Sequence, residues 1–143
     1  MQVTLAVLAD WAATTDQGKL VIAGVFETIN APALPATHPM MALALRLAAD
    51  PGESSNHRLT LRLVDPDGDE VIPALDGDIS FGEIHPQEGG RAQVILNMPG
   101  VLFSKAGAHS LEVLVDGRLE HSIDLFVRLT PLSDEGLSGH QLH

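Results

Sequence analysis

One stretch decides the fold class of this chain, and it reads Leu111-Glu112-Val113-Leu114-Val115-Asp116-Gly117-Arg118-Leu119-Glu120-His121-Ser122-Ile123-Asp124-Leu125-Phe126-Val127-Arg128-Leu129. Apolar residues occupy every second position on both sides of Asp116-Gly117. This alternation around an Asp-Gly turn is typical of a half-buried antiparallel hairpin. The stretch therefore predicts a sheet packed over a core, and it points to no reaction.

The same hairpin predicts its own register. A two-residue loop would set Val113 opposite Glu120, whereas a three-residue loop over 115–117 sets Val113 opposite Leu119 and His109 opposite Ile123. Residues that face each other across an antiparallel pair share one side of the sheet, so the hydrophobic pattern favours the longer loop. We predict a type I turn followed by a bulge, with Gly117 in the left-handed conformation.

The rest of the chain continues this pattern outward from the hairpin. Short apolar runs separated by turn residues predict strands over 3–9, 20–29, 40–49, 59–63, 71–75, 78–81 and 91–98. Pro99-Gly100 predicts a turn, and residues 101–107 are expected to lead into the hairpin. A short helix over 10–13 is a weaker alternative. The prolines in 30–39 favour an extended link between two sheets.

These elements define the expected architecture. No helical period separates the strands, so an all-β fold is predicted: a two-sheet antiparallel β-sandwich, immunoglobulin-like in the broad sense, with a small β-barrel second. One domain is expected over residues 1–130, followed by a flexible C-terminal tail over 131–143.

Composition restricts the partners. The chain has 143 residues, a formal charge of -11 and only eight Lys and Arg residues, so we expect neither nucleic acid nor a membrane surface as a partner. The absence of cysteine excludes disulfides and thiolate sites. Residues 1–10 lack the pattern of a secretory signal, and no apolar run is long enough to span a bilayer, which predicts a cytoplasmic protein.

The order of residues also resembles a known family. The runs Val3-Thr4-Leu5-Ala6-Val7-Leu8-Ala9-Asp10, Gly18-Lys19-Leu20, Gly24-Val25-Phe26 and Pro35-Ala36-Thr37-His38-Pro39, then Arg46, Phe103, Gly107 and the Asp116-Gly117 hairpin, are similar to a family of short, uncharacterised bacterial proteins over roughly residues 1–130. The resemblance implies a compact β-sandwich of unknown function and supplies no catalytic residues.

Two groups of residues raise the question of a metal. Asp65-x-Asp67-x-Asp69, with Asp76 at the twelfth position, resembles a calcium loop, but Glu70 stands where that loop needs glycine. We therefore favour a solvated type I turn over Asp65-Pro66-Asp67-Gly68 with Gly68 left-handed, whose register sets Leu63 opposite Val71 and Leu61 opposite Pro73. The seven histidines include one close pair, His140-x-x-His143, and we interpret His109 and His121 as inner-face residues of the hairpin rather than zinc ligands. No cofactor or metal is predicted.

The strand over 40–49 carries the clearest sign of a contact surface. Its outer row contains Ala42, Ala44 and Ala48, which is unusually apolar for a solvent face. The 30–39 link, a second copy of the chain or another protein could cover this row. The predicted contact surface comprises Ala42, Ala44, Arg46, Pro35 and His38.

These observations favour binding over catalysis. The serines show no nucleophile elbow, and no catalytic residue is assigned. The sequence predicts a non-catalytic protein-interaction or structural module that self-associates, as a homo-oligomer or with a protein partner. The alternative is a small-molecule or metal-binding domain, with enzymatic activity as a further option, that uses His85, Glu83 and neighbouring loop residues.

Overall fold

The computed structural model describes residues 1–131, and the predicted tail from residue 132 onward lies outside the described residues. Within that range the chain forms nine β-strands and no helix, hence none that is long and apolar enough to cross a membrane. The strands are β1 (Gln2–Thr14), β2 (Leu20–Phe26), β3 (Thr28–Ala31), β4 (Ala36–Ala49), β5 (Asn56–Val64), β6 (Leu75–Ser80), β7 (Gly90–Phe103), β8 (Gly107–Val115) and β9 (Arg118–Leu129).

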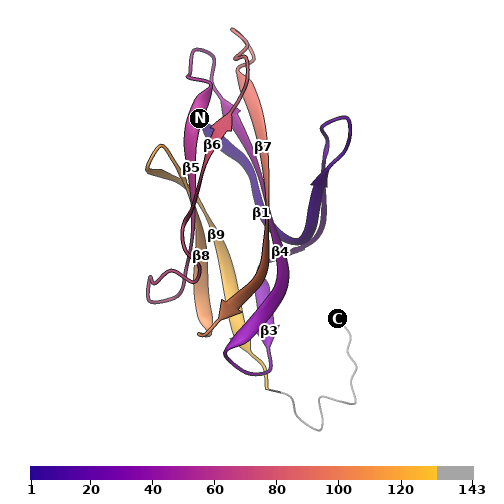
Figure 1. The fold of residues 1–143 in the computed structure, drawn as a ribbon, viewed down its shortest axis with the longest axis vertical. Coiled ribbons are helices and arrows are strands. Elements are labelled where there is room, and N and C mark those ends of the chain that lie inside the picture. Colours follow the sequence, from indigo (N-terminus) through magenta and orange to yellow (C-terminus); the bar gives the residue numbers. More distant parts are fainter. Residues whose placement is uncertain (132–143) are drawn as a thin grey trace.

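Two sheets pack face to face (Figure 1). One has the order β2-β1-β4-β7 and the other β3-β9-β8-β5-β6, which confirms the predicted two-sheet sandwich. The expectation of purely antiparallel pairing is corrected at one edge, where β3 pairs parallel with β9. The apolar run over 20–29 is split at Glu27, where the chain leaves the first sheet and joins the second as β3. The proline-rich segment after β3 then returns the chain to β4, as predicted.

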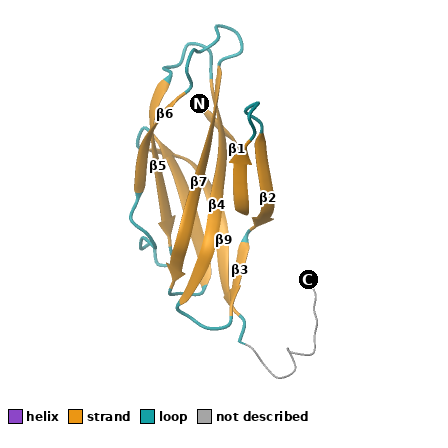
Figure 2. Ribbon diagram, turned by 45° about the vertical axis from the view of Figure 1, so that its right-hand side comes forward, coloured by secondary structure: helices purple, strands orange, loops and turns teal. Residues whose placement is uncertain are grey.

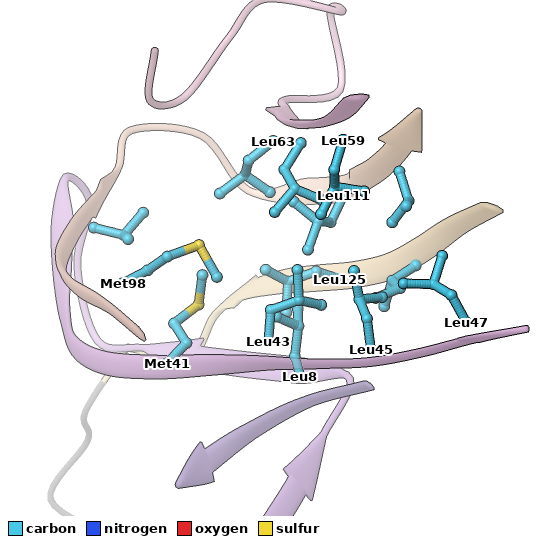
Figure 3. Close-up of a cluster of buried hydrophobic side chains, with 14 of the residues drawn as sticks. Leu8, Met41, Leu43, Leu45, Leu47, Leu59, Leu63, Met98, Leu111 and Leu125 are labelled. Carbon is cyan, nitrogen blue, oxygen red and sulfur yellow. The ribbon is translucent and has the colours of Figure 1, made fainter. Parts of the chain in front are cut away.

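The core lies between the two sheets (Figure 3). Leu43, Leu45 and Leu47 of β4 are fully buried and face Leu59 and Leu63 of β5, with β8 and β9 completing the layer. Alternate residues of each strand point inward, as the pleat of a sheet requires. Aliphatic side chains fill this core because the chain is only 3% aromatic.

The outer face of β4 is covered by the chain itself. Ala42 and Ala44 have no exposed surface and pack against Ala12, Leu20 and Ile22 of β1 and β2. Of the three alternatives left open for this row, cover by the chain itself is the one found, and the covering segment is the β1–β2 hairpin rather than the 30–39 link. A small side chain is needed here because the hairpin approaches the strand closely.

The hairpin reaches this position because β1 continues as a strand where a short helix was the alternative. Gln2–Ala9 pairs with β4, whereas Leu8–Thr14 pairs with β2. The two strands then project from the sandwich as a ribbon (Figure 2), and the Gly18 carbonyl accepts a hydrogen bond from Gln93 Nε2 of β7 at 2.8 Å. We call residues 10–26 the β1–β2 ribbon. Gly24 lets Asp10 pack on it, because a Cβ there would lie 2.4 Å from Asp10 Oδ2.

The β8–β9 hairpin forms with a different register from the predicted one. Its loop has two residues, Asp116 and Gly117, both left-handed with φ of 52° and 80°, which is typical of a type I′ turn. A bulge at Glu120 then restores the hydrophobic pattern, so that His109 faces Leu125 rather than Ile123. His121 pairs with the buried Val113, which places it on the inner side of the sheet as predicted, although its side chain is exposed there.

Prolines explain two further differences. The turn after β5 places Leu63 opposite Val71 as predicted, with the Val71 amide donating to the Leu63 carbonyl at 2.8 Å, but β6 begins only after Pro73, and Leu61 therefore faces Leu75. The turn predicted at Pro99-Gly100 is absent, and β7 runs through it. Pro99 is tolerated there because β7 is an edge strand whose outer side needs no donor.

Asp116 and His57 fasten the β8–β9 turn to β5. Asp116 Oδ1 accepts the Arg58 amide at 2.9 Å, and Asp116 Oδ2 lies 2.7 Å from His57 Nδ1. His57 Nε2 lies 2.8 Å from the Ser54 carbonyl, so both ring nitrogens face acceptors and the imidazolium satisfies both. The hydrogen bond to Asp116 raises the pKa of His57, and the hydrogen bonds from the Arg58 amide and His57 lower the pKa of Asp116.

The covered alanine row makes a prediction about stability. Replacing Ala44 with leucine inserts three carbons beneath the β1–β2 ribbon and is expected to cost about 1–3 kcal/mol of unfolding free energy. The matched change Ala108→Leu, at an exposed strand position, is expected to stay within about 0.5 kcal/mol of the parent. Urea unfolding of both variants measures the difference, and equal effects would contradict the covered face.

The His57 contacts predict a pH dependence. Because the folded-state pKa is raised, the contribution of His57 to stability is complete below the unfolded pKa of about 6.5 and is lost as the pH rises through the folded value. The stability difference between the parent and His57→Gln should therefore shrink from about pH 5.5 to pH 9. Urea unfolding across that range measures it, with exposed His121→Gln as the control. A difference that is constant with pH would contradict the assignment.

Candidate functional site

The outward face of the β1–β2 ribbon carries exposed apolar side chains. Trp11, the only tryptophan of the chain, is 53% exposed, and Val25 is 58% exposed. Trp11 faces Ala23 across the strand pair, with Val25 paired to Ala9 and the exposed Val21 paired to Ala13. These positions share one side of the ribbon because facing residues of an antiparallel pair point the same way. The ribbon is thus apolar on both sides: one side packs on Ala42 and Ala44, and the other faces outward.

The free edge of β2 adjoins this face. Among the described residues, β2 pairs with β1 alone, so its other edge carries backbone donors and acceptors without a strand partner. Its sequence, Leu20-Val21-Ile22-Ala23-Gly24-Val25-Phe26, contains no charged residue. Edge strands of soluble proteins are usually protected by charges, proline or a short length, because an open apolar edge pairs with another chain.

The predicted contact residues do not form one exposed surface. Ala42 and Ala44 lie under the ribbon, Arg46 and His38 are half-buried, and Pro35 is exposed in the link before β4. The His38 ring lies 5.5 Å from that of Phe26 at the end of β2. Contact through Pro35, His38 and Arg46 stays a prediction. The exposed residues of the ribbon were missed because their strands are apolar on both sides, which conceals the outward face.

A polar cluster occupies the loop between β5 and β6. The carboxylates of Asp65, Asp67 and Asp69 lie within 4.8 Å of one another, and the Lys105 ammonium pairs with all three. Asp65 Oδ1 also accepts the amides of Asp67 and Asp69, at 2.8 and 3.0 Å. Hydrogen bonds to Asp67 and Asp65 raise the pKa of Lys105. The turn predicted from the sequence is present, with Gly68 in the left-handed conformation.

A small cavity of about 110 Å³ adjoins this cluster. Asp65, Glu70, Ser104, Lys105 and His109 supply its polar lining, and Val71 and Leu102 its apolar lining. His109 is 2% exposed, in agreement with its predicted place on the inner face of the hairpin. Its Nδ1 lies 3.1 Å from the Gly107 carbonyl, whereas its Nε2 is buried without a hydrogen-bond partner.

The residues of the alternative site are arranged differently. His85 Nδ1 accepts the amides of Gln87 and Glu88, at 3.1 and 3.0 Å, and so organises its own loop. Glu83 is exposed in the same loop. Within residues 1–131, Asp65, Asp67 and Asp69 form the group of at least three potential ligands that is spaced to hold a metal ion, and neither Glu83 nor His85 belongs to it.

A second hollow lies where the sandwich opens between β6 and β7. This groove has a volume of about 470 Å³ and is lined by inner-face residues of β5, β6 and β7, including Leu59, Leu61, Ile79, Val94 and Leu96. Gly77 contributes no side chain to it, and a Cβ added there would meet no atom within 4 Å. The groove exposes part of the core beside two edge strands.

Part of a solved structure is similar to this chain. No curated protein matches the chain. A structure of the Pseudomonas fluorescens alkylpurine DNA glycosylase AlkC, bound to DNA containing an abasic site analog, is similar with a TM-score of 0.44 and 12% sequence identity. The match covers 86% of this chain and 30% of the glycosylase chain, so this chain spans less than a third of the length of the glycosylase.

This comparison corrects one expectation from the sequence. We expected no nucleic-acid partner from the charge of -11, and the partly similar structure belongs to a protein that is bound to DNA. The exclusion of nucleic acid is therefore withdrawn.

The family comparison covers most of the chain. A sequence model of a protein family matches residues 4–128, a range that extends from β1 into β9. The resemblance inferred from the sequence and the all-β fold agree with this result. The chain belongs to DUF6941, a family of unknown function.

Proposed function

We propose that this protein is a non-catalytic interaction module that self-associates through the β1–β2 ribbon, with a second copy of the chain paired along β2. The observation that carries the proposal is the open edge of β2, which is uncharged over Leu20–Phe26 and adjoins the exposed side chains of Trp11, Val21 and Val25. Such an edge offers both backbone hydrogen bonds and apolar area to a partner.

Charge supports a contact at this place. A chain with a net charge of -11 repels its own copies, so two copies approach most favourably where neither presents a carboxylate. Residues 11–14 and 20–26 of the ribbon contain no charged residue, and Asp10, Asp16 and Glu27 lie outside these runs. The side of the ribbon that carries Trp11, Val21 and Val25 is therefore a surface on which self-association costs little electrostatic energy.

Symmetry supports a second copy as the partner. Two β2 strands that pair antiparallel are related by a two-fold axis, so the same residues meet their equivalents on the partner. Pairing would join the β2-β1-β4-β7 sheets of two copies and shelter the Trp11 face. The proposal includes a cytoplasmic location, which the lack of cysteine supports, since cytosolic domains fold without disulfides.

The mass of the protein in solution tests the proposal. We expect sedimentation equilibrium to approach twice the chain mass of 15.2 kDa as concentration rises. Val25→Glu places like charges at the contact and should weaken association by at least about 100-fold. Emission of Trp11 should shift to shorter wavelength on association of the parent and not of the variant.

A matched substitution controls for a general effect of added charge. Leu119 of β9 is 56% exposed, nearly as much as Val25, and lies outside the ribbon. Leu119→Glu should leave the dimer intact. A parent protein that stays at 15.2 kDa at all concentrations would overturn the proposal, as would equal weakening by both variants.

A further inference from the structure

The groove between β6 and β7 lacks a large side chain at its centre. β6 and β7 are edge strands of different sheets, and among the described residues each pairs with a strand on one side only. Gly77 of β6 faces the buried Leu59, and a Cβ added to Gly77 would meet no atom within 4 Å. Ala92 of β7 also lines the groove with a small side chain. A volume of about 470 Å³ is therefore left open beside the core.

The groove offers apolar side chains and an unpaired strand edge together. Leu75 at the start of β6 is 37% exposed, and Val94 and Leu96 of β7 are partly buried. The outer edge of β6 carries backbone donors and acceptors without a strand partner in the part of the chain that the structure describes. A compact apolar ligand would leave that edge unpaired, whereas an extended chain segment pairs with the edge and covers the apolar surface beside it.

The side chains of β6 specify the sequence pattern of an added strand. Residues that face each other across two paired strands point to the same side of the sheet. Leu75, Gly77 and Ile79 point inward, so the partner residues opposite them must be apolar, with the largest opposite Gly77. Asp76 and Asp78 point outward, so the partner residues opposite them face carboxylates. The matching segment therefore alternates apolar and basic residues.

Charge selects a basic partner. Of the described residues that line the groove, the charged ones are Asp76 and Asp78, and both are acidic. Asp78 lies 3.2 Å from Arg58 but is 84% exposed, and Asp76 Oδ1 accepts a hydrogen bond from the Thr60 hydroxyl at 2.6 Å. The net charge of -11 attracts a basic segment from a distance, and it repels a second copy of the chain at this acidic rim.

We propose that the edge of β6 and the adjoining groove bind an extended, basic segment of another protein, about five residues long, in which apolar and basic side chains alternate. The segment adds one strand to the β3-β9-β8-β5-β6 sheet. Its central apolar side chain occupies the space beside Gly77 and closes the opening toward β7. This surface contains no residue of the β1–β2 ribbon, so the site goes beyond the proposed self-association.

Fluorescence anisotropy of a labelled peptide with the full chain tests the proposal. The probe is a peptide of about seven residues that alternates leucine and lysine. One control peptide has the same composition with its leucines grouped at one end, and a second has glutamate in place of lysine. We expect the alternating lysine peptide to bind with a Kd of about 1–100 μM, and both controls to bind at least about tenfold more weakly. Hydrogen exchange should show protection of β6 amides when the alternating peptide is added.

Variants of the chain separate groove binding from general attraction to an acidic protein. Gly77→Leu fills the open space and should weaken binding at least about tenfold without lowering the free energy of unfolding in urea. Ala108→Leu, at an exposed strand position outside the groove, should leave binding unchanged. The pair Asp76→Asn with Asp78→Asn should weaken binding about three- to tenfold.

Several results would overturn the proposal: no binding of the alternating peptide, equal binding of either control peptide, or parental affinity in a folded Gly77→Leu variant. Protection of β6 that rises with protein concentration in the absence of peptide would assign the groove to a second copy instead. Sedimentation equilibrium of Gly77→Leu keeps the two proposals distinguishable, because the ribbon is unaltered and the dimer should persist.

Discussion

The fold depends on the burial of β4 on both of its faces. Leu43, Leu45 and Leu47 fill the space between the sheets, whereas Ala42 and Ala44 on the other side leave room for the β1–β2 ribbon. Large residues are needed where the sheets stand apart, and small residues where a second layer comes close. This asymmetry lets a short chain cover one sheet with its own N-terminal hairpin.

The position of the ribbon determines what the protein presents to other molecules. Once one side of the ribbon covers Ala42 and Ala44, its other side and the edge of β2 are left outward. The charge of the chain is carried elsewhere, as at the Asp65–Asp69 loop and the Asp116 turn. Hydrogen bonds to loop amides and pairing with Lys105 or His57 hold these acids in place.

The sequence was sufficient for much of the fold because strand alternation and turn chemistry are local. The two sheets, the β5–β6 turn at Gly68, the crossing link and the buried position of His109 could be predicted from the residues. The register of β8–β9 could not, because a bulge at Glu120 changes the spacing without changing the turn residues. The alternation of apolar and polar residues shows which residues of β8 and β9 share a side of the sheet. It does not distinguish between two pairing registers that differ by two residues.

The site was less predictable for a related reason. Ala42 and Ala44 were correctly recognised as an unusual row, but the segment that covers them lies about thirty residues earlier and is apolar on both sides. Nothing local distinguishes the half-buried Ile22 from the exposed Val25 of the same strand. The acidic loop could be recognised in the sequence, whereas its pairing with Lys105 depends on the meeting of two distant loops.

The central claim is that the uncharged edge of β2 pairs with a second copy of the chain. Backbone hydrogen exchange of residues 20–26, measured at several protein concentrations, tests it most directly. The account predicts that outward-facing amides of β2 become protected as concentration rises, while those of the other edge strands β6 and β7 exchange at unchanged rates. Rates for β2 that do not depend on concentration would contradict it.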